Sequence, residues 1–154
     1  MADLAPFFAA WLARTRCNQV YIHGAHHLTS GSAFFADHAF YAELYAAYED
    51  AYDTLAEKAC GLGLYALAEP AKVWAGVGPL LSQIPPLVGA DAETIAKGVL
   101  ALELAWQMTL QDHVGKLPNA PLGLDDYLRG LADSHDVFVY KLRQRTGGRP
   151  AVMS

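Results

Sequence analysis

The sequence has few cysteines, and their positions exclude several classes of protein. Cys17 and Cys60 are the only two among 154 residues. They form no CxxC pair and show none of the spacings of a structural zinc site. A small scaffold held together by disulfides is therefore excluded, and we expect two reduced, buried thiols.

Long apolar runs are also missing. No stretch reaches the roughly eighteen apolar residues of a membrane span, and the first residues lack the features of a secretory signal. We therefore expect a cytoplasmic protein with no membrane contact. Charged residues make up only 18% of the chain, and the mean hydropathy is +0.14. Because polar surface is scarce, we expect part of the apolar surface to be buried between subunits.

Positive charge is scarce as well, which bears on nucleic-acid binding. The net charge is −5 and the opening sequence MADLAPFFAAWLARTR contains no lysine. The basic candidates for phosphate contacts are scattered: Arg14, Arg16, Arg143, Arg145 and Arg149. Such a surface suits cations better than a polyanion, so DNA binding is not expected. The sequence also lacks a P-loop, a GxGxxG after a strand and a GxSxG motif.

Four long stretches of the sequence have helical periodicity. Their apolar residues recur at steps of three and four. The first begins after Asp3, whose side chain can cap it, and runs toward His26. The second spans Ser32–Cys60 without proline or glycine, with Ser32 as a plausible cap. The third follows Asp91, and the fourth ends at Gly147.

The connection between the second and third helices contains four prolines between residues 70 and 86. They exclude a long regular element but leave room for a short helix around Glu69 to Trp74. A connection of this length predicts a crossover, which makes the second and third helices parallel. The sequence therefore predicts an all-α, ferritin-like four-helix bundle whose long crossover carries a short helix, in one domain spanning residues 1–154.

The second helix carries candidate metal ligands. Asp53 and Glu57 are four residues apart, so their oxygens can converge on one cation, although such a pair alone is commonly a solvated acidic face. His38 precedes Asp53 by fifteen residues, which is about 22 Å along a helix axis. One straight helix therefore cannot bring them together. Two copies packed antiparallel about a two-fold axis near Ala46 could do so.

Together these residues resemble the motif of the Dps family of mini-ferritins. The matching residues are His26, the Gly31 turn, Phe34-Phe35, His38, Asp53-Thr-Leu-Ala-Glu57-Lys58 and a following glycine. The resemblance implies that His26 and His38 of one subunit, with Asp53 and Glu57 of another, are the metal-binding and catalytic residues.

The resemblance also implies an activity and an assembly. Fe(II) would be bound and oxidised with peroxide or dioxygen as the oxidant, and ferric mineral would be stored in a hollow shell, which protects against oxidative stress. The shell would be a homo-oligomer, a dodecamer built from two-fold dimers. Its iron would pass between the Fe(II) and Fe(III) states.

The sequence departs from the family pattern at several positions. Ala42 replaces a further carboxylate, Lys58 replaces an arginine, and His27 replaces a tryptophan. The Lys-rich N-terminal tail common in the family is also missing. Two alternatives therefore stay open: a DNA-binding nucleoid protein, and a structural bundle oligomer with a degraded metal site.

Other polar residues have ordinary structural interpretations. We expect His23 and His27 to be structural or solvated, and His135 to be a core histidine with a hydrogen-bond partner. Tyr41, Tyr45, Tyr48 and Tyr52 form a stripe that we interpret first as core packing. Asp125 and Asp126 open the last helix, where they either stabilise the helix start or line an acidic pore, as the family resemblance implies.

Overall fold

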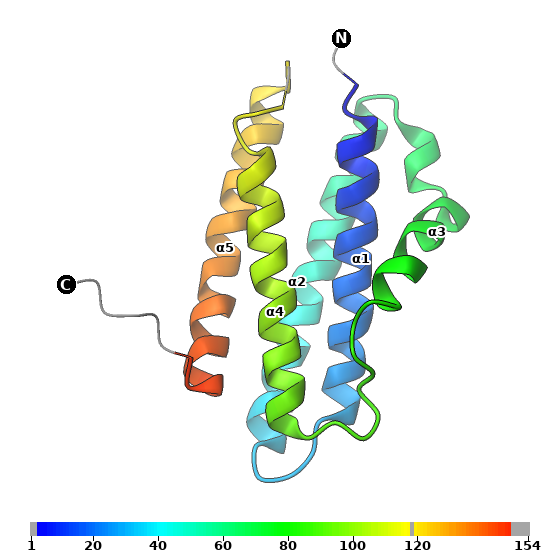
Figure 1. Cartoon of the computed structure of the whole chain (residues 1–154). Helices are drawn as coiled ribbons and strands as arrows, with labels where there is room; N and C mark the ends of the chain where they lie inside the picture. The colour runs from blue at the N-terminus through cyan, green and yellow to red at the C-terminus, as the bar shows by residue number, and fades with distance from the viewer. Residues whose placement is uncertain (1–2, 118, 149–154) are drawn as a thin grey trace, which may run out of the picture.

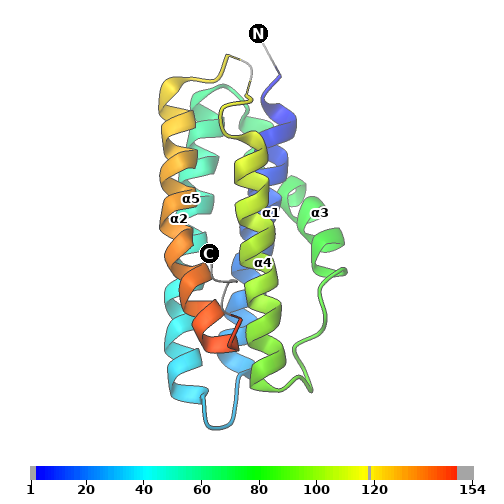
Figure 2. The same cartoon turned by 60° about the vertical axis from the view of Figure 1, so that its left-hand side comes forward.

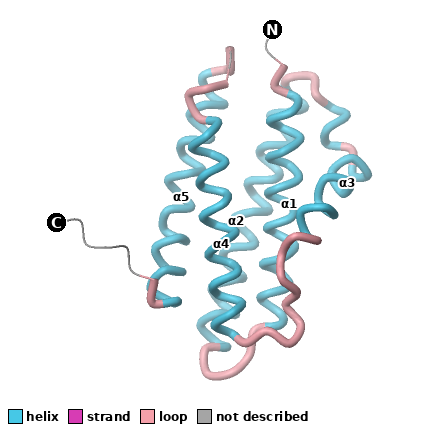
Figure 3. Tube along the Cα trace, viewed as in Figure 1, coloured by secondary structure: helices cyan, strands magenta, loops and turns pink. Residues whose placement is uncertain are grey.

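Four long helices form the body of the protein (Figure 1). The computed structural model describes residues 3–117 and 119–148. Its elements, in chain order, are α1 (Ala5–Leu28), α2 (Phe34–Gly61), the 3-10 helix η1 (Tyr65–Ala68), α3 (Pro70–Leu81), α4 (Ala92–His113) and α5 (Leu122–Thr146). Loops join these helices, and the described residues contain no strand (Figure 3). None of the described helices is both long and apolar enough to cross a membrane.

The four long helices are arranged as two antiparallel hairpins, α1–α2 and α4–α5 (Figures 1 and 2). The segment between the hairpins returns from one end of the bundle to the other, so α2 and α4 run in the same direction. The predicted ferritin-like bundle with a long crossover is confirmed. Helix α3 lies outside the bundle, against α1.

The helix ends follow from local chemistry. Helix α4 follows Asp91, as predicted, and the Asp91 side chain caps it by accepting a hydrogen bond of 2.7 Å from the Thr94 amide. Gly147 ends α5 with a φ of 70°, which a residue without Cβ adopts at little cost. The expected cap of α2 is wrong, because the N-cap position is Ala33 and no side chain caps this helix.

The short helix in the crossover is longer than predicted. It has 12 residues and continues through Pro79, whereas we had expected it to end near Trp74. Pro79 has no N–H to bond the carbonyl of Ala75, so the helix loses one hydrogen bond here and ends two residues later, at Leu81. Val73 and Val77 pack against Cys17 of α1. Gly76 makes this contact possible, since a Cβ at this position would lie 2.8 Å from the Ala13 Cβ.

A buried polar network joins the two hairpins at the middle of the bundle. The Glu103 carboxylate accepts a hydrogen bond from the Tyr48 hydroxyl, and its other oxygen lies 2.8 Å from His135 Nδ1. Asn18 donates to the Tyr48 hydroxyl over 3.1 Å. All four residues are buried, and each comes from a different long helix. The prediction that His135 is a core histidine with a partner is confirmed.

A second polar contact joins the hairpins where α4 ends. The buried Trp11 donates from Nε1 to His113 Nδ1 over 2.9 Å. Burial lowers the pKa of His113 and outweighs the neighbouring Asp112 carboxylate, which acts in the opposite direction. His113 is therefore neutral near pH 7, and Nδ1 is free to accept.

We expect this contact to make the stability of the protein depend on pH. The pKa of His113 is lower in the folded protein than in the unfolded chain, so the unfolded chain binds more protons between the two values. The contribution of the neutral His113 side chain to stability is therefore complete above about pH 6.5, and it is lost as the pH falls below that value. Protonated Nδ1 cannot accept from Trp11, which costs about 1 kcal/mol, the net value of one hydrogen bond.

A His113→Gln variant is the matched comparison, because its Oε1 can accept from Trp11 and does not titrate. Urea unfolding followed by tryptophan fluorescence between pH 7.5 and 5 should show a smaller loss of unfolding free energy in this variant than in the parent. Parallel pH profiles for the two proteins would contradict a role for His113.

Candidate functional site

Two predicted ligand histidines meet at one end of the α1–α2 hairpin. His26 lies in the last turn of α1 and His38 in the first turns of α2. The connecting turn contains Gly31, which has a φ of 85° and so needs a residue without Cβ. The two rings stack with centroids 3.6 Å apart and an interplanar angle of 23°.

Reciprocal hydrogen bonds fix both rings. His26 Nδ1 lies 2.7 Å from the His38 carbonyl oxygen, and His38 Nδ1 lies 2.8 Å from the His26 carbonyl oxygen. A carbonyl oxygen only accepts, so each Nδ1 carries a proton and donates. In a neutral imidazole, Nε2 then keeps its lone pair. Histidine ligands of metal ions are commonly oriented in this way.

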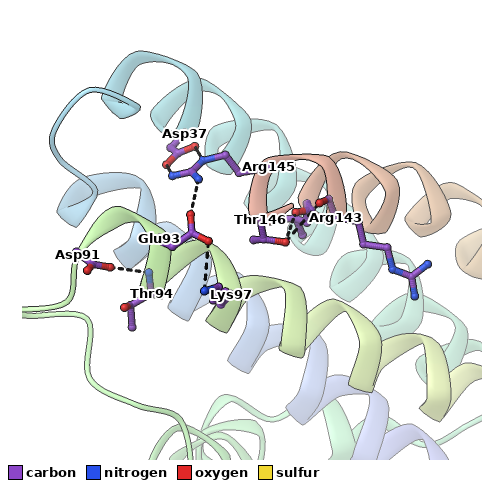
Figure 4. Close-up of polar contacts among 9 residues, drawn as sticks. Asp37, Asp91, Glu93, Thr94, Lys97, Arg143, Arg145 and Thr146 are labelled. Carbon is purple, nitrogen blue, oxygen red and sulfur yellow. Dashed lines mark hydrogen bonds and ion pairs between the residues drawn. The ribbon is translucent and has the colours of Figure 1, made fainter. Parts of the chain in front are cut away.

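A partly buried ion pair, in which Asp37 is the buried member, holds the start of α2 in place next to these histidines. Arg145 of α5 donates two hydrogen bonds to Asp37, of 2.9 and 3.0 Å, and a third of 2.8 Å to Glu93 of α4. Figure 4 shows the guanidinium between the two carboxylates. Its bond to Asp37 is the largest cause of a raised Arg145 pKa. We had counted Arg145 among possible DNA contacts, and its partners Asp37 and Glu93 were not anticipated.

The predicted acid pair lies on the other half of α2. Asp53 and Glu57 are both exposed, and neither forms a hydrogen bond or ion pair within the described part of the chain. Helix α2 is continuous from Phe34 to Gly61, so the acids are about 22 Å along its axis from His38. Within residues 3–117 and 119–148, no three His, Cys, Asp or Glu side chains are placed to hold one ion. One chain thus brings together the two histidines but not the histidines and the acids.

The exposed face of α2 has two chemically different halves. The half near the histidines is mostly apolar, with Phe35 86% exposed and Ala39 also exposed, and its exposed Glu43 is paired with Lys141 of α5. The other half is acidic. In an antiparallel pair of α2 helices centred on Ala46, positions equally distant from Ala46 face each other. Ala39 then faces Asp53, and Phe35 faces Glu57, so the acids of one copy lie beside the histidines of the other.

Several of the remaining predicted positions have structural contacts. The Asp125 carboxylate accepts a hydrogen bond from the Gly115 amide and pairs with Arg129, and these bonds lower its pKa. Asp125 therefore stabilises the start of α5. The Arg16 guanidinium lies 3.8 Å from the centroid of the Tyr52 ring. Arg149 lies outside the described residues.

Two antiparallel hairpins joined by a long crossover are typical of ferritin-like proteins. The structure is similar to that of Dps from Thermosynechococcus elongatus, with a TM-score of 0.73, over 98% of this chain and 97% of that chain. The identity is 18%, so the likeness shows the fold alone. Neither a protein-family model nor a curated protein sequence matches this chain. The predicted resemblance to Dps is confirmed for the fold, while the roles of His26, His38, Asp53 and Glu57 stay a prediction.

Proposed function

We propose that this chain is a mini-ferritin of the Dps type, which binds and oxidises Fe(II) at sites shared between two copies. Peroxide or dioxygen is the oxidant, and the ferric product is stored as mineral inside a hollow, dodecameric shell built from two-fold dimers, which protects the cell from oxidative stress. The observation that carries the proposal is the pair of reciprocal hydrogen bonds between His26 and His38. They leave both Nε2 atoms without a hydrogen-bond partner among the described residues, on the hairpin whose helix α2 also carries the exposed Asp53 and Glu57.

The donor set suits ferrous iron as a substrate. Two neutral imidazole nitrogens and two carboxylates form a mixed nitrogen and oxygen set, which Fe(II), Mn(II) and Zn(II) all accept. Burying the two acids in a dimer interface is costly unless a cation neutralises them. Bound Fe(II) meets this requirement, and its loss after oxidation to the mineral would restore the acidic site.

In this mechanism the protein contributes binding and orientation. The Asp53 and Glu57 carboxylates attract and hold Fe(II), with Glu57 able to bridge two ions, while the locked imidazoles of the partner copy add neutral donors. Two Fe(II) ions each give one electron to a peroxide, which takes up two protons and forms two water molecules. Free Fe(II) and peroxide are therefore consumed together.

The acid pair gives the direct test. We expect Asp53→Asn and Glu57→Gln each to slow the initial Fe(II) oxidation rate at least about tenfold, because each removes a charged ligand and almost no volume. The rate is measured by the absorbance of the ferric product after peroxide addition. Glu49→Gln is the matched control, since it removes an exposed charge from the same helix, one turn from Asp53.

Shell assembly is followed in parallel by mass in solution. Parent-like rates in both ligand variants would show that the acid pair is only a surface feature. An inactive parent protein that still assembles would favour the alternative of a structural bundle oligomer with a degraded metal site, for which Ala42 is the motivating residue.

A further inference from the structure

A second pair of histidines lies on α1, one turn from the His26 site. His23 and His27 are four residues apart, and their ring centroids are 4.7 Å apart with an interplanar angle of 37°. Neither ring forms a hydrogen bond to any other described residue, in contrast to His26 and His38. Their ring nitrogens therefore have no protein partner in the part of the chain that the structure describes.

The spacing of the two rings fits a shared metal ion. An imidazole nitrogen lies about 2.0–2.1 Å from bound Zn(II), which places the ring centroid roughly 3.2 Å from the ion. Two rings that subtend about 90–110° at the ion then have centroids roughly 4.5–5.3 Å apart. The observed separation of 4.7 Å falls within this range, as does the 5.1 Å between the His26 and His27 rings, but the His26 ring is already bonded through Nδ1 whereas His23 is not.

The surroundings fix one ring and leave the other open to solvent. The His23 ring lies against the Tyr45 ring, with centroids 4.2 Å apart and planes 31° apart. This contact limits the orientations of His23 and lowers the entropy cost of chelation. His27 is exposed, so an ion reaches the pair from solvent without any rearrangement of the bundle.

We propose that His23 and His27 chelate one divalent transition-metal ion of the class that prefers imidazole, namely Cu(II), Ni(II) or Zn(II). Two nitrogen donors without a carboxylate favour these ions over Mg(II) or Ca(II), and the Irving–Williams order places Cu(II) first. Water completes the coordination, because no third described His, Cys, Asp or Glu is placed to join them. The site lies within one chain, so it does not rest on the proposed iron oxidation or on a dimer.

Cu(II) alone is the probe for the test. The background protein carries Asp53→Asn and Glu57→Gln, so that the acid pair does not compete for the ion. Affinity is measured by titration calorimetry, and nitrogen ligation by the hyperfine pattern in the electron paramagnetic resonance spectrum. We expect one ion per chain bound through two nitrogens.

Three variants in this background locate the ligands. His23→Phe keeps an aromatic ring against Tyr45, and His27→Ala changes an exposed position, so neither should disturb folding. Each should lower Cu(II) affinity at least tenfold, and combining them should add little, because one nitrogen alone does not chelate. His26→Asn is the control, because His26 is the other ring at chelating distance from His27, and it should leave the affinity within about twofold.

Parent-like affinity in His23→Phe and His27→Ala, or a loss that follows His26→Asn in place of His23→Phe, would overturn the proposal. Because these readouts need no iron chemistry, an absence of Fe(II) oxidation in the parent protein would leave them unchanged.

Discussion

Two inactive variants should recover Fe(II) oxidation when they are assembled together. The first carries His26→Asn and His38→Asn, and the second carries Asp53→Asn and Glu57→Gln. Each should be inactive alone, since every site lacks half of its ligands. A dimer with one copy of each has one site that lacks all four ligands and one that is complete. Activity should approach half of the parent level in fully mixed dimers and about a quarter after random mixing in equal amounts.

This expectation follows from the geometry of α2. His38 and the acids lie on one continuous helix, about 22 Å apart along its axis, so no rearrangement of side chains brings them together within one chain. Asparagine suits the histidine positions because its side-chain N–H can reach the same carbonyl oxygen that Nδ1 now contacts. The hairpin end should therefore keep its shape.

Mixed dimers are prepared by unfolding and refolding the two chains together, with one chain isotopically labelled. Native mass spectrometry confirms that both chains occur in the same dimer. Separately folded shells mixed without exchange serve as the control and should stay inactive. Inactive dimers that contain one chain of each kind would show that the site is not shared, and the antiparallel packing about Ala46 would lose its support.

The sequence was sufficient to predict the architecture because apolar residues recur at helical spacing many times within each of the four long helices. The boundaries of α4 followed from Asp91 and from the glycine at residue 115, and the direction of the crossover followed from its length. The extent of α3 did not follow, since a proline weakens a helix without always ending it, and only the structure shows that α3 continues through Pro79.

The contacts around the candidate site were less predictable than its residues. A spacing motif selected His26 and His38, but nothing in their spacing indicates that each Nδ1 bonds to the other residue's backbone. Asp37 looks like one more acidic residue at a helix start, and Arg145 like a surface charge. Their pairing joins positions 108 residues apart, and a single sequence contains no signal for such a contact.

Glu103 was missed for the same reason, although we expect its substitution to have the largest effect on stability. It is fully buried on α4, and its two oxygens contact Tyr48 of α2 and His135 of α5. The pKa of Tyr48 lies well above its usual value, mainly because the side chain is buried and secondly because the Glu103 carboxylate is next to it. Tyr48 therefore keeps its proton and acts as a donor to Glu103.

Glu103→Ala should lower the free energy of unfolding by about 3–5 kcal/mol, because it leaves the Tyr48 and His135 donors buried without an acceptor and also opens a cavity.

The measurement is urea unfolding at a fixed protein concentration, since assembly contributes to apparent stability. Glu49→Ala, on an exposed position of α2, is the control and should stay within about 0.5 kcal/mol of the parent. A triple variant with Glu103→Leu, Tyr48→Phe and His135→Leu should recover part of the loss, because it removes both donors that Glu103 accepted from and leaves only the Asn18 amide without its acceptor. If Glu103→Ala costs no more than Glu49→Ala, the network does not join the hairpins energetically. If the triple variant is no more stable than Glu103→Ala, the cost lies in packing and not in the unpaired donors.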